Sequence, residues 1–245
     1  MKIGLQMYTL RSEMTDPAST REAFRRVKEI GYEVVQLAGD LASMEAAGKI
    51  ALEEGLEVVS LMSNLNAYAA DPAETFRICK ELGISDVGIS SGIATPEEAE
   101  TLIQAANAFA AKAAAEQITL SYHNHSNELI RPDGKTPLLA ILAEKLDPAV
   151  CFTPDTYWLQ HGGADVRQWL SILGPRTKVL HVKDMMRAPE GPVFAEIGQG
   201  NLWWEEILPL ASALKIPWCV VEQDICRRDP FESIRISYEY LRSLL

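Results

Sequence analysis

Short apolar segments recur along the chain at intervals that leave room for a helix between them. Eight of these segments have the length of a β-strand: Ile3 to Tyr8, Glu33 to Ala38, Glu57 to Met62, Asp86 to Ser90, Ile118 to His123, Val150 to Asp155, Lys178 to Lys183 and Trp218 to Gln223. Between them the apolar spacing changes to three and four residues, and in Thr20 to Ile30 it places Ala23, Val27 and Ile30 on one stripe. The pattern predicts strands that alternate with amphipathic helices.

The predicted helices have well-marked beginnings and ends. Five of them begin with a capping residue followed by proline: Asp16-Pro17, Asp71-Pro72, Thr95-Pro96, Thr136-Pro137 and Asp229-Pro230. The side-chain oxygen of the capping residue accepts a hydrogen bond from a free backbone N–H of the first turn. Proline has no backbone N–H, so it leaves none unpaired at this position. Thr95 has Glu98 three residues later, which is the spacing of a capping box. Helix ends are predicted at glycines that can adopt a left-handed conformation: Gly31, Gly55 and Gly83.

Eight strand and helix units in one chain of 245 residues, without a long linker, favour a single α/β domain over residues 1–245. The predicted fold is a closed (β/α)8 TIM barrel. An open doubly wound sheet is the lesser alternative, because it usually carries a glycine-rich turn after its first strand. Here that position reads Leu10-Arg11-Ser12-Glu13.

The chain is acidic, with 34 Asp and Glu residues against 23 Lys and Arg residues and a formal net charge of -11. This balance argues against nucleic acid as a partner. No uninterrupted apolar stretch reaches the ~18 residues that a membrane span needs, so no membrane partner is expected. The first residues enter a strand-like segment without a targeting leader, which predicts a cytoplasmic location. The four cysteines lack C-x-x-C spacing and are expected to be reduced.

Four side chains that commonly bind metals each end an apolar segment in the second half of the chain: His123, Asp155, His181 and Glu222. In a TIM barrel the functional groups gather at the carboxyl ends of the strands, so these residues are expected to converge. Two imidazoles and two carboxylates suit one divalent ion, with Mn, Zn, Co and Mg as candidates.

Several neighbouring residues are further candidates for the same site. His125 would share a face of an extended strand with His123, and either of them could be the ligand. Lys183 could orient a substrate oxygen or stabilise developing negative charge, although a structural salt bridge explains it equally well. Trp158 could stack on a sugar or pack beneath a loop. The segment Gly198-Gln199-Gly200 could approach a ligand through backbone amides or simply form a turn.

A series of motifs follows in order along nearly the whole chain: Gly4-Leu5-Gln6-Met7-Tyr8-Thr9-Leu10-Arg11, Tyr122-His123-Asn124-His125, Asp155-Thr156-Tyr157-Trp158, Gly162-Gly163-Ala164-Asp165, His181-Val182-Lys183-Asp184, Glu196-Ile197-Gly198-Gln199-Gly200-Asn201-Leu202 and Val221-Glu222-Gln223-Asp224. Their order and spacing resemble the xylose isomerase-like TIM barrel family. That family is also known as the sugar phosphate isomerase/epimerase group, and it shares its fold with endonuclease IV.

The resemblance implies metal ligands from strands five to eight in the order Glu, Asp, His and Glu. The last three match Asp155, His181 and Glu222, whereas His123 replaces the first glutamate. Epimerases of the family use the two glutamates as a proton-shuttling pair on opposite faces of the substrate. In this chain only Glu222 keeps that role.

We therefore expect a divalent-metal-dependent isomerase or epimerase of a sugar or keto-sugar that acts through an enediolate, with Glu222 as the proton acceptor. The candidates for a second proton-transfer group are His125, Lys183 and Glu196. The candidate substrate contacts are Gln6, Tyr8, Tyr157 and Trp158.

Three other functions stay open at this stage. A metal-dependent lyase or hydratase on a keto-sugar would need one base and one acid rather than two symmetric carboxylates. An endonuclease IV-like nuclease would need a multi-metal cluster and a positively charged groove. A non-catalytic binding barrel is the remaining alternative. The expected partner is a small carbohydrate, and assembly into a homo-oligomer through the outer helices stays open.

Overall fold

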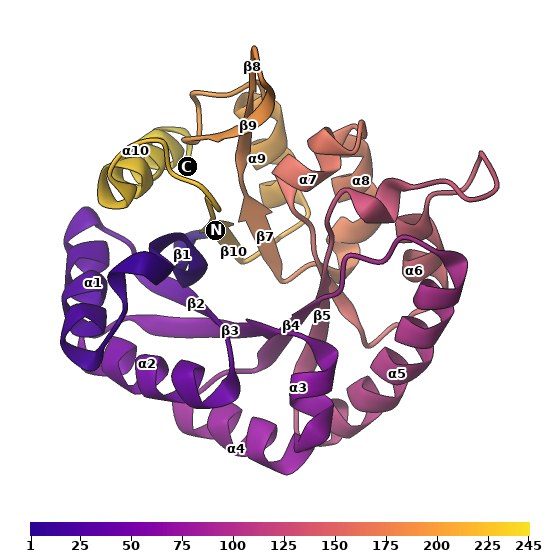
Figure 1. Ribbon diagram of the computed structural model, residues 1–245, viewed down its shortest axis with the longest axis horizontal. Coiled ribbons are helices and arrows are strands. Elements are labelled where there is room, and N and C mark those ends of the chain that lie inside the picture. Colours follow the sequence, from indigo (N-terminus) through magenta and orange to yellow (C-terminus); the bar gives the residue numbers. More distant parts are fainter.

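A computed structural model describes residues 1–245 and has eight parallel strands in one sheet. The strands run in the order β6-β5-β4-β3-β2-β1-β10-β7. Backbone bridges between Phe152 and Thr177 and between Asp155 and His181 join the two edges. The sheet is therefore the closed barrel of a single (β/α)8 fold, as the sequence predicted (Figure 1). The barrel strands are β1 Lys2–Gln6, β2 Val34–Ala38, β3 Glu57–Ser63, β4 Asp86–Ser90, β5 Thr119–His123, β6 Cys151–Thr153, β7 Val179–Val182 and β10 Trp218–Val221.

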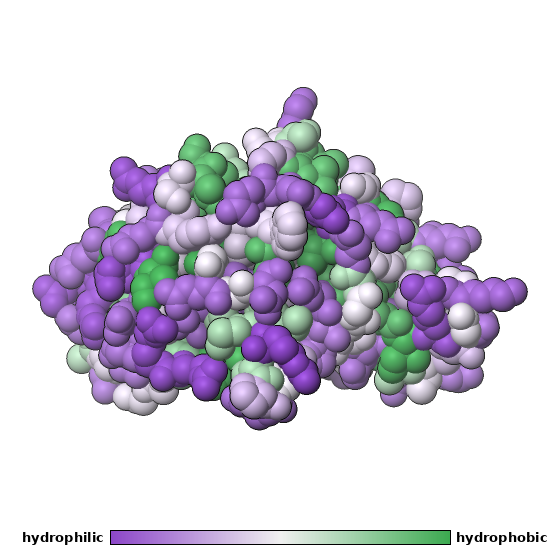
Figure 2. All heavy atoms as spheres, turned by 90° about the horizontal axis from the view of Figure 1, so that it is seen from above, coloured by the Kyte–Doolittle hydropathy of each residue, from purple (hydrophilic) through white to green (hydrophobic).

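Helices surround the barrel as an outer ring (Figure 1). The α-helices are α1 Pro17–Ile30, α2 Leu41–Glu53, α3 Leu65–Ala70, α4 Pro72–Leu82, α5 Pro96–Ala115, α6 Leu138–Lys145, α7 Thr156–His161, α8 Val166–Leu173, α9 Trp204–Ala213 and α10 Pro230–Leu244. The 3-10 helices are η1 Met7–Glu13, η2 Asn127–Leu129 and η3 Gly174–Arg176. The face of the molecule drawn in Figure 2 is mostly hydrophilic with smaller hydrophobic patches, as expected where amphipathic helices surround an apolar core. None of the helices combines the length and the apolar character needed to cross a membrane.

Most of the predicted caps are present. Asp16, Asp71, Thr95 and Asp229 each accept a backbone amide of the following helix, with proline in its first turn. The capping box between Thr95 and Glu98 is confirmed as well.

The predicted cap at Thr136 is wrong. Pro137 itself holds the N-cap position of α6 in an extended conformation, and no side chain caps this helix. Asp133 Oδ1 instead accepts the amides of Lys135 and Thr136 at 2.8 and 2.6 Å. These two residues are therefore held in a preceding turn, and the helix begins later.

A two-stranded antiparallel hairpin follows β7 directly and is not among the eight strands that the sequence predicted. It consists of β8 Asp184–Ala188 and β9 Gly191–Ala195. The hairpin carries the chain away from the barrel before it returns to α9 (Figure 1).

Apolar side chains close the barrel interior beneath the polar site. A small cluster separate from the main core consists of Val34, Val59, Val179 and Val220. Because side chains on a strand alternate between faces, the residues two positions after three of these valines point into the same interior. Those residues are Gln36, His181 and Glu222.

Candidate metal centre

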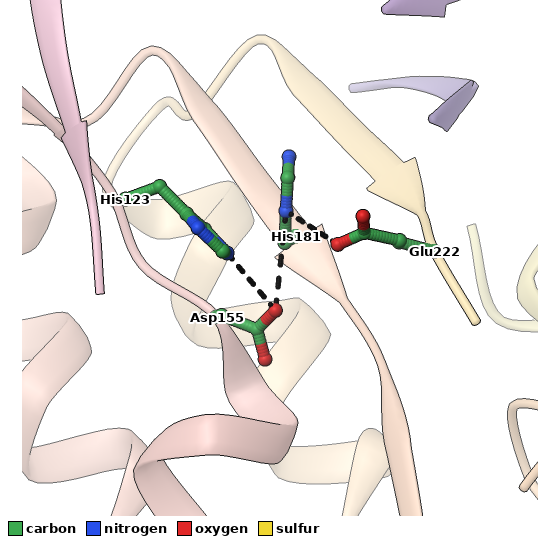
Figure 3. A group of neighbouring side chains, drawn as sticks. All are labelled: His123, Asp155, His181 and Glu222. Carbon is green, nitrogen blue, oxygen red and sulfur yellow. Dashed lines mark hydrogen bonds and ion pairs between the residues drawn. The ribbon is translucent and has the colours of Figure 1, made fainter. Parts of the chain in front are cut away.

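The four predicted metal ligands converge at the carboxyl ends of neighbouring strands. His123 is the last residue of β5, Asp155 precedes α7, His181 lies in β7 and Glu222 follows β10. All four are buried, and one ligand atom from each lies within 4.8 Å of the others. Figure 3 shows the four side chains directed toward a common point. The proximity expected from the sequence is thus present.

The distances within this cluster suit a divalent cation. His123 Nε2 lies 3.2 Å from Asp155 Oδ2, and His181 Nδ1 lies 3.1 Å from Glu222 Oε2 and 3.9 Å from Asp155 Oδ2. His181 Nδ1 is buried and lacks a hydrogen-bond partner of good geometry, whereas Glu222 Oε2 lies 2.9 Å from Lys183 Nζ. Buried polar atoms without partners are rare, and a metal-ligand bond of about 2.0–2.1 Å would satisfy His181 Nδ1. The donor set therefore fits one ion.

Both carboxylates of the cluster are held ionised, which is the state that a metal needs. Burial would raise the pKa of Asp155, but Lys183, His123 and His181 outweigh it and leave that pKa below its ordinary value. Burial likewise opposes ionisation of Glu222, yet Lys183 and His181 bring its pKa well below the ordinary range. The two carboxylates of the cluster therefore both carry full charge.

Lys183 is a buried cation inside this cluster. Its Nζ lies 3.2 Å from Asp155 Oδ2, 2.9 Å from Glu222 Oε2 and 3.1 Å from Asp224 Oδ2. Burial lowers the pKa of Lys183, but the three carboxylates more than reverse this and raise it above the ordinary value. The amine therefore stays an ammonium that can donate hydrogen bonds and stabilise negative charge.

His125 lies beside the cluster rather than in it. Its ring is T-shaped against His123 with the centroids 5.0 Å apart, and its Nδ1 is 3.3 Å from Ser90 Oγ. Glu128 Oε2 accepts the backbone amide of His125 at 2.9 Å and fixes the loop. Burial, followed by the nearby His123, lowers the pKa of His125 to about 4. The imidazole is therefore neutral near pH 7 and able to accept a proton.

A cavity of about 530 Å³ opens onto the cluster. The lining residues that the sequence had proposed for the site are Gln6, Tyr8, His123, His125, His181, Lys183 and Glu222. Further lining residues include Arg11, Ala38, Met62, Ser90, Asp224 and Ile225, which the sequence analysis did not propose. Only Asp224 had a local signal, because it follows the last strand two residues after Glu222.

Besides the buried candidate ligand Asp155, three proposed residues do not line this cavity. Glu196 accepts a hydrogen bond from Ser233 Oγ at 2.8 Å and pairs with Arg228 Nε at 3.2 Å. Tyr157 is buried and stacks on Phe194 at a centroid distance of 4.1 Å. Trp158 packs between Tyr157 and His125. These contacts support a structural role for the three residues, and their assignment to catalysis or substrate binding stays a prediction.

The fold and the buried cluster define a (β/α)8 barrel with a candidate metal centre at the carboxyl ends of its strands. A sequence model described as xylose isomerase-like TIM barrel matches residues 24–244. The chain therefore belongs to the xylose isomerase-like TIM barrel family. No curated protein sequence matches the chain.

Solved structures share the fold over nearly the full length. A sugar phosphate isomerase/epimerase from Parabacteroides distasonis ATCC 8503 has a TM-score of 0.81 and 26% identity, over 98% of this chain and 97% of that chain. A xylose isomerase-like TIM barrel protein from Mycobacterium smegmatis, in complex with magnesium, has a TM-score of 0.75 and 15% identity, over 99% and 96% of the two chains. The 3-keto-D-glucoside 4-epimerase YcjR from E. coli has a TM-score of 0.74 and 18% identity, over 99% of each chain.

A pair of histidine variants tests the ligand assignment. We expect His123→Ala to weaken divalent-ion binding by more than the 10–100-fold that is typical for loss of an outer contact, because a ligand atom itself is lost. His125→Ala is the matched control and should keep the affinity of the unmodified protein. Calorimetric titration of the metal-free proteins with Mn²⁺ measures both. Loss of binding in His125→Ala with normal binding in His123→Ala would reverse the assignment.

Proposed function

We propose that the protein is a divalent-metal-dependent isomerase or epimerase of an unphosphorylated sugar or keto-sugar. The observation that carries this proposal is the cluster of His123, Asp155, His181 and Glu222 at the base of an open cavity. When bound, a divalent ion would polarise a substrate carbonyl and favour removal of the proton on the adjacent carbon. The epimerase from E. coli and the isomerase/epimerase from Parabacteroides distasonis support this class of reaction.

The ionised Glu222 is the proposed proton acceptor, since it is the cluster carboxylate that lines the cavity. Removal of the carbon-bound proton beside a carbonyl places negative charge on the carbonyl oxygen, and loss of the neighbouring hydroxyl proton then gives the enediolate. Lys183, 2.9 Å from Glu222 Oε2, is placed to stabilise that charge as an ammonium donor. His125 is the proposed partner that returns a proton, because its neutral ring lines the cavity, can first accept the proton of the neighbouring substrate hydroxyl, and can then donate that proton.

The charges around the cavity favour a neutral substrate over a phosphorylated one. Its two cationic lining residues are Arg11 and Lys183. Lys183 is already paired with carboxylates, and Arg11 donates to the carbonyl oxygens of Tyr8 and Asp224 at 2.9 Å each. The amides of Gly198 and Gly200, considered above as ligand contacts, instead donate to Asp184 Oδ2 at 2.9 and 3.2 Å.

Turnover in deuterated water tests this proposal. We expect the product of a keto-sugar or aldose substrate to carry deuterium at the carbon beside the carbonyl, because the returned proton exchanges with solvent. Mass spectrometry and NMR of the product measure the label, with the metal-free protein as the control. Turnover without label would indicate a direct hydride shift and contradict the enediolate route.

A lyase or hydratase reaction is the second candidate, and the replacement of the first glutamate by His123 favours it. Elimination from the enediolate needs one base and one acid, and Glu222 together with His125, once His125 has accepted the substrate hydroxyl proton, is an asymmetric pair of this kind. The same assay separates the two reactions, because loss of water or of an alcohol changes the product mass whereas isomerisation and epimerisation do not.

A further inference from the structure

A chain of buried hydrogen bonds leads from a backbone amide to one of the candidate metal ligands. It begins where the backbone N–H of Tyr8 donates to Gln6 Oε1 at 3.2 Å. A backbone amide nitrogen can only donate, so the facing side-chain atom must be an oxygen. The orientation of the Gln6 amide is thereby determined, and its Nε2 must be the atom that faces Gln36.

The orientation of the Gln6 amide determines which atoms donate and which accept in the next two contacts. Gln6 Nε2 donates to Gln36 Oε1 at 2.7 Å, and His181 Nε2 lies 2.5 Å from the same oxygen. A carbonyl oxygen cannot donate, so His181 Nε2 must carry a proton. In the neutral imidazole the lone pair then lies on Nδ1. This is the atom that faces Asp155 and Glu222.

The alternative amide orientations do not satisfy these contacts. A flipped Gln6 would bring its NH₂ group against the Tyr8 amide, and a flipped Gln36 would bring two NH₂ groups together. Gln6, Gln36 and His181 are essentially inaccessible to solvent, so water cannot substitute for the missing acceptor. Gln36 Nε2 has no hydrogen-bond partner. The Gln36 side chain therefore leaves its NH₂ group unpaired, while its oxygen accepts hydrogen bonds from both Gln6 and His181.

We propose that Gln6 and Gln36 are positioning residues that set the tautomer of His181, so that its Nδ1 lone pair is directed at the cation of the proposed metal site. Gln6 had been expected to contact substrate. Its carbonyl oxygen is engaged by Tyr8 and its NH₂ group by Gln36, which supports this other role. Histidine ligands commonly have their second nitrogen fixed in this way by a hydrogen-bond acceptor.

The tautomer is measured directly by nitrogen NMR of the metal-free protein labelled with ¹⁵N-histidine, with the His181→Gln variant used for assignment. We expect His181 Nε2 to show the shift of a protonated ring nitrogen and Nδ1 that of an unprotonated one. Gln36→Leu should give a mixture of tautomers, and Gln36→Glu, which keeps an acceptor, should restore the single form. A protonated Nδ1 in the unmodified protein would overturn the proposal.

Metal affinity provides the second measurement. We expect Gln36→Leu to bind Mn²⁺ about 10–100-fold more weakly than the unmodified protein, and Gln36→Glu to recover much of the loss. Circular dichroism and thermal unfolding establish that each variant is folded. Gln6→Leu is a second variant that interrupts the same series of hydrogen bonds at a different residue. Unchanged affinity in a folded Gln36→Leu variant would contradict the proposal. If the protein binds no divalent ion but His181 has the expected tautomer, the proposed function fails while the tautomer assignment stands.

Discussion

Replacing Glu222 with glutamine is expected to lower kcat by about 10²–10⁴-fold, the contribution typical of a positioned general base. The amide has the same shape and keeps one oxygen for a cation, but it cannot accept a proton at neutral pH. Deuterium incorporation into the product should fall in parallel, because the same proton transfer limits both. Steady-state kinetics at saturating divalent ion, with bound metal determined on the same samples, measure this effect.

Asp224→Asn is the matched control for this variant. Asp224 also contacts Lys183, at 3.1 Å, and also lines the cavity, but it is not one of the clustered ligands. We expect its kcat to stay within about tenfold of the unmodified protein, because no general base is lost. A Glu222→Gln variant that retains its metal and turns over normally would show that Glu222 is not the proton acceptor.

The sequence predicted the barrel and the metal cluster because both depend on local patterns. Strand length, helical spacing and helix caps each depend on only a few neighbouring residues. The barrel fold then brings the carboxyl ends of all strands to one face. Asp155, His181 and Glu222 could be recognised because each directly ends an apolar segment. His123 could be distinguished from His125 only in the structure, where the loop after β5 turns His125 aside through Glu128.

Long-range contacts explain what the sequence did not predict. Gln36 and His181 are 145 positions apart, and their hydrogen bond follows from how the barrel closes. Glu196 was expected near the site as a candidate for the second proton-transfer group. The hairpin of β8 and β9 instead directs it toward Ser233 on α10. A hairpin inserted after β7 leaves no clear mark in apolar spacing, so the direction of the returning chain could not be derived.

Lys183→Met is expected to destabilise the metal-free protein by about 3–5 kcal/mol at neutral pH, the cost typical of removing one partner from a buried ion pair. Asp155 and Glu222 would then be buried without their main cationic partner. Thermal and denaturant unfolding of metal-free samples measure the loss. Lys145→Met is the control, since the Lys145 pair with Glu100 is half exposed and should contribute no more than about 1 kcal/mol.

The destabilisation should shrink as the pH falls. Lys183 lowers the pKa values of Asp155 and Glu222, so it contributes stability above their ordinary pKa values, and this contribution is lost as the pH falls through the lowered ones. In the Lys183→Met variant both carboxyl groups should protonate at a higher pH than in the unmodified protein. Once neutral, they no longer carry the free-energy cost of a buried charge. Unfolding curves of the two proteins should therefore be closer near pH 4 than near pH 7.

A divalent ion should rescue the Lys183→Met variant more strongly than it stabilises the unmodified protein. The ammonium contacts Asp155 Oδ2 and Glu222 Oε2, which are also the oxygens that lie nearest the ring nitrogens of the two candidate histidine ligands. Without the ammonium, the bound ion is the main positive charge near these two carboxylates, so the dissociation constant for Mn²⁺ should fall. The value of kcat should also fall, because the hydrogen-bond donor that stabilises the enediolate is lost. Binding that becomes weaker instead would mean that Lys183 holds the carboxylates in place for the ion rather than competing with it.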